Sequence, residues 1–409
     1  MNIDDYIVAT RQINNDVSES LAQAYLDIYV EILKGFSFNE FDFPELLVVN
    51  TLNKQTQLVS FKNSKILICD QYLGQTINEL SRIFYSAESP EDAKSMVFRI
   101  MSETASYCGE NEVAVTLACL YSTAHHRSHG YKSNETIELR AKRLLSVHVQ
   151  EAFIIAHELS HLSWALSNID KTAIDWLLDF VLQVSDIDVE KVLEQYLDDL
   201  SFQYHGNPVP HAHNIKTDED RLRDVKMRER LRNEIIESHE RTVELHCELS
   251  KNDHFREEIY ADWQAAQTCL ELFSDTMPAD DLIIAVHLAM ENITTISFIV
   301  SETYSLLNLQ IEYDSRAVGA RKRALRRSLE QWVSEHVPSM QDGCLKFLAD
   351  SNARYMNLVR DPMTVTIASD LISFGLLDEA IVKSMYGDII EAIPNASDPQ
   401  FIIKNRPFK

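Results

Sequence analysis

The feature that most constrains this chain is an apolar segment, residues 152–166, that carries ionisable side chains in its middle. Apolar residues occupy almost every side of the helix that this segment would form, so we expect a buried helix. The segment nevertheless contains His157, Glu158 and His161, in the pattern H-E-x-x-H. Burying two imidazoles and a carboxylate costs several kcal/mol unless a partner satisfies them. A bound cation would be such a partner.

The spacing within this pattern indicates which residue does what. Residues four apart lie on one face of a helix, so His157 and His161 can both direct a ring nitrogen at one ion. Glu158 lies about 100° round the helix from His157, close enough to reach an attacking water without binding the ion. We therefore expect two histidine ligands and a glutamate general base. The plain alternative is a chance match to a five-residue pattern.

A third ligand would separate these two interpretations. In H-E-x-x-H-x-x-G-x-x-H enzymes a glycine and a third histidine follow the pair, but Trp164 and Ser167 occupy those positions here. A later segment, R-E-E-I-Y-A-D, instead offers Glu258 and Asp262, which share one face of a helix. We expect Glu258 to be the third ligand. Asp262 would accept a hydrogen bond from the remote ring nitrogen of a histidine ligand.

Other arrangements of this third ligand stay open. Glu257 points about 100° away from Glu258 on the same helix and lacks an acidic residue four positions on. The acidic pair could also be an ordinary solvated face, although an apolar stripe beside it should pin this helix to the core. A ligand from a loop remains a further alternative, and the histidines available there are His205, His211 and His213.

H-E-L-S-H with a downstream E-I-Y-A-D resembles the gluzincin zinc metallopeptidases. The form E-x-x-A-D is most similar to the family of the CAAX-prenyl endopeptidase and the heat-shock membrane protease, including its soluble minigluzincin relatives. The chain is more loosely similar to the phage-exclusion peptidases, which cleave a host protein in the cytosol. The resemblance implies one Zn²⁺ per chain, held by His157, His161 and Glu258, with Glu158 as the base in peptide-bond hydrolysis.

The resemblance also implies how substrate binds and how the reaction is assisted. In that family a short sheet precedes the H-E-x-x-H helix, and its edge strand binds extended substrate. The segment Ser64–Asp70 is our candidate for that edge strand, with Ile66, Leu67 and Ile68 at its centre. A donor from a later segment should stabilise the oxyanion, and the candidates are Tyr313, Arg321 and His287.

Hydrophobic periodicity predicts a mostly α fold with a small β-sheet, that is, an α+β chain, and the resemblance implies that it contains a zincin-like catalytic core. Strand signals cluster only between residues 46 and 69, and helical periodicity dominates from residue 76 onward. The scarcity of glycine, 9 of 409 residues, disfavours a hairpin-rich fold and a phosphate-binding glycine loop. We expect an N-terminal helical segment (1–44), a metallopeptidase core (45–310) with a charged insertion (206–251), and a C-terminal helical region (311–409).

Composition limits the partners and the location. The formal net charge of −25 argues against nucleic acid and against anionic membrane surfaces as partners, which leaves a protein or peptide substrate. Six cysteines without a C-x-x-C pair, and no secretory signal, predict a cytoplasmic protein with free thiols. The apolar stretch 282–300 is interrupted by polar residues, so we expect no spanning helix.

Three functions are therefore compared. The first is a soluble zinc endopeptidase, with a regulated defence or toxin role by analogy alone. The second is a non-catalytic helical scaffold or interaction protein that zinc stabilises. The third is a helical interaction protein with a chance motif and no metal. The segment 216–251, rich in charge, could be a solvated helix pair, a lid or a partner-binding arm in any of them.

Overall fold

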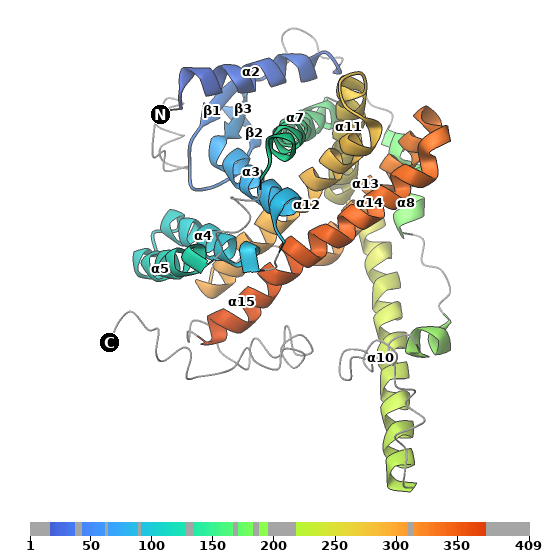
Figure 1. Ribbon diagram of the computed structural model, residues 1–409. Coiled ribbons are helices and arrows are strands. Elements are labelled where there is room, and N and C mark those ends of the chain that lie inside the picture. Colours follow the sequence, from blue (N-terminus) through green and yellow to red (C-terminus); the bar gives the residue numbers. More distant parts are fainter. Residues whose placement is uncertain are drawn as a thin grey trace.

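The fold is mostly helical with one small mixed sheet, as the sequence predicted (Figure 1). The computed structural model describes residues 17–36, 43–61, 64–88, 91–127, 135–166, 171–182, 188–194, 218–309 and 314–373. Within these ranges the sheet and helix α2 (Glu19–Leu33) lie beside a body of long helices, and one charged helix projects away from that body.

The sheet has three strands in the order β1-β3-β2. β1 (Glu45–Val49) runs parallel to β3 (Ser64–Asp70), and β2 (Gln57–Phe61) runs antiparallel to it. The prediction that Ser64–Asp70 is an edge strand is therefore wrong, because β3 lies in the centre. Its residues Ile66, Leu67 and Ile68 are at most 4% exposed, which suits a strand paired on both sides.

β1 and β2 are the edge strands of the described sheet, and the outer edge of β2 faces α7, because the Leu58 amide of β2 contacts Glu158 of α7. A continuous apolar run such as that of β3 indicates burial, but burial alone does not tell which neighbours a strand has. The turn before β2 is held by Asp70, whose carboxylate accepts hydrogen bonds from the backbone amides of Thr51 and Lys54. Lys54 takes a positive φ of 54° there, an uncommon conformation that the surrounding bonds maintain.

Helix α7 (Ile137–Ala165) is the central helix of the protein. Its first turn is capped by Thr136, whose side chain accepts a hydrogen bond from the Leu139 amide. α7 packs against α3 (Gln71–Ser86), α11 (Asp253–Phe273) and α12 (Ala279–Leu306). The segment with H-E-x-x-H therefore lies among helices on several sides, as its apolar character predicted.

The most apolar stretch of the sequence lies within helix α12. This helix is the one described helix long and apolar enough to cross a membrane, but 83% of its most apolar window is buried inside the protein. Its neighbours include α4 (Glu91–Tyr107), α7 and α13 (Ser315–His336). The hydropathy of α12 is thus that of a core helix, and this placement suits a soluble protein.

One main hydrophobic core joins distant parts of the chain. It extends from Tyr25 in α2 to Ile367 in α15 (Asp361–Ser373), so residues from all three predicted segments contribute to it. A second cluster packs α8 (Asp175–Leu182) against the start of α11 and the middle of α13. Further described helices are α5 (Asn111–Arg127), α14 (Gln341–Tyr355) and the short helices Lys171–Ile174, Pro338–Met340 and Met356–Arg360.

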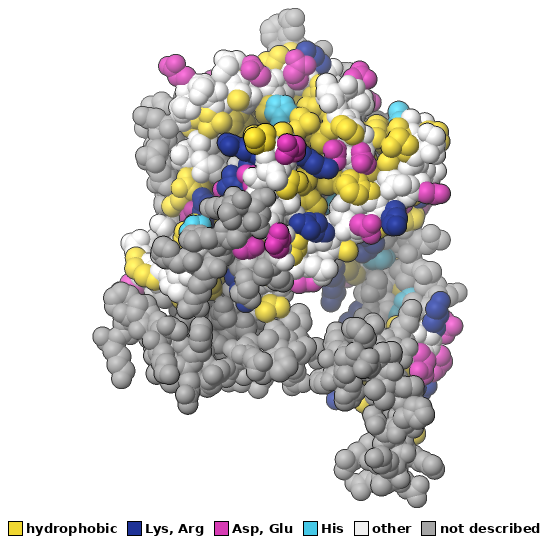
Figure 2. Space-filling view, viewed as in Figure 1, with side chains coloured by type: hydrophobic (Ala, Val, Ile, Leu, Met, Phe, Trp, Pro, Cys, Tyr) yellow, Lys and Arg dark blue, Asp and Glu magenta, His cyan; other side chains and the backbone are white. Residues whose placement is uncertain are grey.

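The charged segment forms a single helix, α10 (Asp218–Ser250), that projects from the body (Figure 1). Arg228 and Arg232 of α10 pair with Glu194 and Glu190 at 2.6 and 2.7 Å. Exposed ion pairs of this kind contribute little to stability. Figure 2 shows acidic and basic side chains interspersed over the visible described surface, so the net negative charge is not gathered in one patch there.

Candidate metal centre

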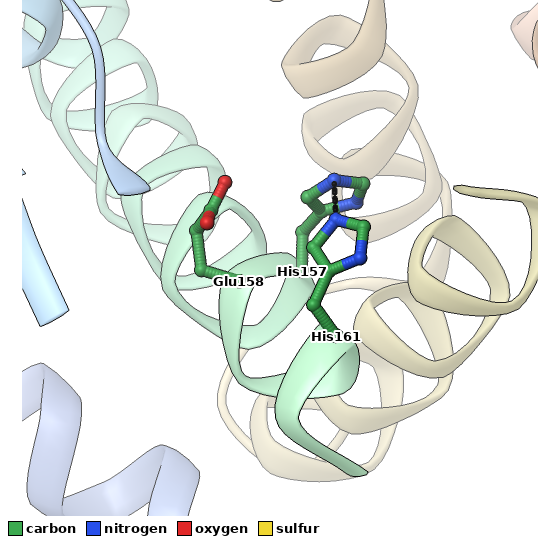
Figure 3. A group of neighbouring side chains, drawn as sticks. All are labelled: His157, Glu158 and His161. Atoms are coloured by element: carbon green, nitrogen blue, oxygen red, sulfur yellow. Dashed lines mark hydrogen bonds between the residues drawn. The ribbon is translucent and has the colours of Figure 1, made fainter. Parts of the chain in front are cut away.

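The two histidines of H-E-x-x-H face each other on α7. The Nε2 atoms of His157 and His161 lie 3.2 Å apart, and the rings meet edge to face (Figure 3). Glu158 leaves the same helix on the adjacent side. Donor atoms of these three residues lie within 4.8 Å of one another, in a group able to hold a metal ion. The spacing of the motif thus produces the predicted convergence of two imidazoles.

Helix α11 brings Glu258 to this pair. One carboxylate oxygen of Glu258 lies 3.7 Å from His157 Nε2, and the other lies 3.6 Å from His161 Nε2. Around a tetrahedral zinc with bonds of about 2.1 Å, neighbouring ligand atoms should lie about 3.4 Å apart. All three separations are close to that value, so the donor set and its spacing fit Zn²⁺ with a fourth position left open.

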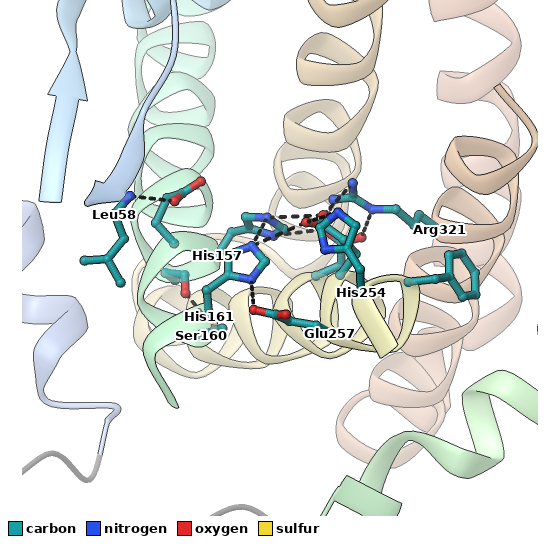
Figure 4. Close-up of polar contacts among 12 residues, drawn as sticks. Leu58, His157, Ser160, His161, His254, Glu257 and Arg321 are labelled. Atoms are coloured by element: carbon teal, nitrogen blue, oxygen red, sulfur yellow. Dashed lines mark hydrogen bonds and ion pairs between the residues drawn. The ribbon is translucent and has the colours of Figure 1, made fainter. Parts of the chain in front are cut away.

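Two further carboxylates orient the histidine rings. Asp262 Oδ1 lies 3.0 Å from His157 Nδ1, and Glu257 Oε1 lies 2.8 Å from His161 Nδ1 (Figure 4). Each contact engages the Nδ1 atom and leaves Nε2 directed at the common centre, as ligating histidines require. Asp262 lies where the sequence predicted. The contact of Glu257 with His161 is not predicted by the sequence, which offers Glu257 only as an alternative ligand.

Arg321 of α13 contacts two carboxylates of α11, those of Asp262 and Glu258. Its Nε and Nη2 atoms donate to the two oxygens of Asp262 at 2.7 and 2.8 Å, and Nη1 lies 2.6 Å from Glu258 Oε2. Burial alone would raise the pKa of Asp262, but the charge and hydrogen bonds of Arg321 outweigh it and lower that pKa to about 2. Burial also acts to raise the pKa of Glu258, but the charges of Arg321, His157 and His161 together outweigh it and lower that pKa.

The pKa values of His157 and Glu158 are both raised, for different reasons. Burial acts to lower the pKa of His157, but its contact with Asp262 and the charge of Glu258 raise it overall. Burial raises the pKa of Glu158, and the histidines and one backbone hydrogen bond only partly oppose this. That bond comes from the amide of Leu58 in β2, at 2.9 Å. A carboxyl group whose proton affinity is raised in this way suits general-base work near neutral pH.

Two adjoining cavities open beside these side chains. The smaller, about 170 Å³, is lined by His157, Glu158, Glu258, Asp262 and Arg321. The larger, about 500 Å³, extends along α12 and the start of α11. The residues that line both are Lys54, Gln55, Glu258, Ile293, Ile296, Ser297 and Arg321. The site is therefore reached through a cleft between the turn before β2 and three helices.

His254 is a further histidine at this cleft that the sequence analysis missed. It lies one turn before Glu258 in α11, and its Nε2 atom is 3.9 Å from a Glu258 oxygen (Figure 4). Its side chain is 77% exposed and lines the larger cavity. The four-residue spacing of His254 and Glu258 was the available signal, since such residues share a helix face.

The predicted oxyanion donors have different placements. Arg321 lines the smaller cavity, although its guanidinium already contacts Asp262 and Glu258. His287 is buried in α12 near Glu291 and Lys322 and lines neither cavity, so the structure does not bring it to the site. Tyr313 and the three loop histidines, His205, His211 and His213, lie outside the described residues.

Comparison with known proteins adds no family assignment. No family model matches the chain, and no curated protein or solved structure is significantly similar to it. Function must therefore be argued from the residues and their geometry.

Proposed function

We propose that this protein is a zinc-dependent endopeptidase that hydrolyses a cytosolic protein or peptide. The observation that carries the proposal is the convergence of the His157 and His161 Nε2 atoms with the Glu258 carboxylate, at 3.2 to 3.7 Å from one another. Two histidines and a glutamate form the three-ligand set of gluzincin-type catalytic zinc sites, which keep a position free for water or substrate. The H-E-L-S-H and E-I-Y-A-D segments provide the same set in sequence.

The residues around this centre have the properties that peptide hydrolysis requires. When bound, Zn²⁺ supplies Lewis acidity and lowers the pKa of water. Glu158, with its raised pKa, takes a proton from the attacking water and delivers it to the leaving amine. Asp262 and Glu257 keep the histidine rings oriented, and Arg321 fixes the direction of Glu258 and Asp262. Arg321 is also the oxyanion candidate that lines the cavity.

Extended substrate would bind along β2 and not along β3. Of the two edge strands, β1 and β2, it is β2 that contacts Glu158, through the Leu58 amide. A peptide strand added to such an edge gains backbone hydrogen bonds, and the adjoining cavities can receive its side chains. Six free cysteines, three of them buried, support a reducing cytoplasmic location. A role as a regulated defence or toxin effector rests on analogy with the phage-exclusion peptidases.

Zinc analysis of wild type, His157→Ala and Glu158→Gln protein tests the proposal. Wild type should hold about one zinc per chain, His157→Ala should lose it, and Glu158→Gln should retain it. Incubation with a cytosolic extract should generate new peptide termini with wild type but not with Glu158→Gln, because the amide cannot take the proton.

The same experiment separates the other functions. Bound zinc without any cleavage would favour the non-catalytic zinc-stabilised scaffold. Absence of bound zinc from wild type would leave a helical interaction protein with a chance motif. Cleavage that persists in Glu158→Gln would refute Glu158 as the base.

A further inference from the structure

The backbone amide of Leu58 points away from β3, at the outer edge of β2. In the antiparallel pairing of β2 with β3, Leu58 stands opposite Leu67, and neighbouring residues alternate in which edge their backbone groups face. The Leu58 N–H donates to Glu158 Oε2 at 2.9 Å, so it faces the outer edge of β2 and not β3 (Figure 4). An edge amide that would otherwise be free for solvent or a peptide is thus bonded to the proposed general base.

The hydrogen bond from Leu58 matters for Glu158 because this carboxylate has few partners within the described part of the chain. Among the described residues, the Leu58 amide is the hydrogen-bond donor that the structure gives to Glu158. Glu158 is partly buried beside the smaller cavity, and a carboxylate withdrawn from water is costly without a donor. Charged groups that act on Glu158 include His157, His161 and Glu258, the three proposed metal ligands, and Arg321.

The strand that supplies the donor is firmly held. β2 is paired with β3 over its whole length, from Gln57 to Phe61. The turn that leads into it is bonded to Asp70, and the side chain of Lys54 in that turn is buried and lies 2.9 Å from Glu103 of α4. A backbone donor on such a strand has far less freedom than a side-chain donor would have.

We infer that the backbone N–H of Leu58 is the positioning group for Glu158 in catalysis. The inference rests on the proposed peptidase function. It assigns a role to a backbone group of β2 and not to a side chain. With Oε2 tied to the strand, Glu158 keeps its other oxygen, Oε1, for the attacking water at the cavity. The sheet and the base are then one rigid unit, which fixes Glu158 relative to the ligands on α7 and α11.

The contact also constrains how a peptide can lie on β2. Because Glu158 occupies the Leu58 amide, a docked strand would use the Leu58 carbonyl and the outward groups of Ser60. The peptide residue opposite Leu58 then lies next to the base, so this residue adjoins the scissile bond.

Substitution by proline tests the inference, because proline removes a backbone N–H. Leu58→Pro deletes the donor to Glu158 without breaking a bond to β3, whereas Ser60→Pro deletes an amide of the same edge that does not contact Glu158. Ser60→Pro should raise KM, because a docked strand would use the Ser60 amide. Leu58→Pro alone should lower kcat, by roughly tenfold to a hundredfold, with its zinc content intact. A backbone ester in place of the Leu58 amide should act like Leu58→Pro while it keeps the leucine side chain.

Amide hydrogen exchange provides a readout that does not require activity. The Leu58 amide should be protected in wild type and exchange rapidly in Glu158→Ala, whereas the Val59 amide, which faces β3, should stay protected in both. An unprotected Leu58 amide in wild type would overturn the inference. So would an unchanged kcat in zinc-loaded Leu58→Pro. If zinc-loaded wild type hydrolysed no peptide, the proposed function would fail, and the positioning role with it.

Discussion

At the residue scale, neighbouring acidic side chains of α11 have different roles because they leave the helix in different directions. Glu258 faces both Nε2 atoms, while Asp262 and Glu257 each contact one Nδ1 atom. Their surroundings also differ, since the Asp262 side chain is 2% exposed and that of Glu257 is 28% exposed. A charge-assisted contact is stronger where water is excluded. Asp262 should therefore affect metal binding more than Glu257 does.

Asp262→Asn should weaken zinc binding by roughly tenfold to a hundredfold, because His157 loses the carboxylate that orients its ring. Glu257→Gln is the matched control on the same helix and should weaken binding less, since its contact with His161 is partly solvated. Competition with a chelating dye measures both affinities. Equal losses in the two variants would contradict the role assigned to burial.

Glu151 should make stability depend on pH. Burial raises its pKa from 4.5 to about 7, and the hydrogen bond from Tyr25 opposes this only in part. Because this folded-state pKa exceeds the unfolded value, the stabilisation is complete below about pH 4.5 and is lost as the pH rises to about 7. The difference corresponds to at most about 3 kcal/mol.

Glu151→Gln should therefore unfold at higher urea concentration than wild type at pH 8, because its neutral amide can still accept the Tyr25 hydrogen bond. The advantage should shrink as the pH falls toward 5. A stability difference that does not vary with pH would count against the raised pKa.

At the scale of elements, α12 and α10 show how differently two long helices can be stabilised. α12 is buried on most of its surface, and its residues belong to the main core. α10 is held by ion pairs at one side and by a few contacts with α8 and α11, and much of its apolar surface is exposed. Packing supports the first helix, whereas propensity and surface charge support much of the second.

Truncation of one isoleucine on each helix should reveal this difference. Ile283→Ala in α12, at a fully buried position, should lower the free energy of unfolding by about 2 to 5 kcal/mol. Ile236→Ala in α10, where the side chain is 38% exposed, should cost less than about 1 kcal/mol. Urea denaturation followed by circular dichroism provides both values. A similar loss of unfolding free energy in the two variants would mean that another surface covers Ile236 of α10 in solution.

At the scale of the whole molecule, the metal centre joins helices that are distant in sequence but already packed together. α7 and α11 contact each other along their lengths, and Cys269 of α11 approaches the Val149 carbonyl of α7 well away from the centre. The ligand geometry is thus preformed by packing. Metal binding should add stability to a chain that folds without it.

Removal of zinc by a chelator should therefore lower Tm without unfolding the protein at 25 °C. Zinc at a hundred times its Kd should add about 2.7 kcal/mol to the stability. His161→Ala should show no such dependence of Tm on zinc. Calorimetry with and without zinc measures the effect, and a loss of helical circular dichroism on chelation at 25 °C would show instead that the metal is needed for folding.

The sequence by itself determined the helices, their mostly α architecture and the pairing of His157 with His161, because these depend on periodicity within one segment. Helix periodicity likewise directed Glu258 and Asp262 to one face of α11. Only the tertiary structure decided that β3 is central and β2 is the edge, because strand order depends on partners that a single strand's pattern does not encode. It also decided that Glu257 contacts His161, that Arg321 joins two carboxylates, and that the Leu58 amide contacts Glu158. Each of these contacts joins elements whose relative placement follows from packing of the whole core, which no local pattern records.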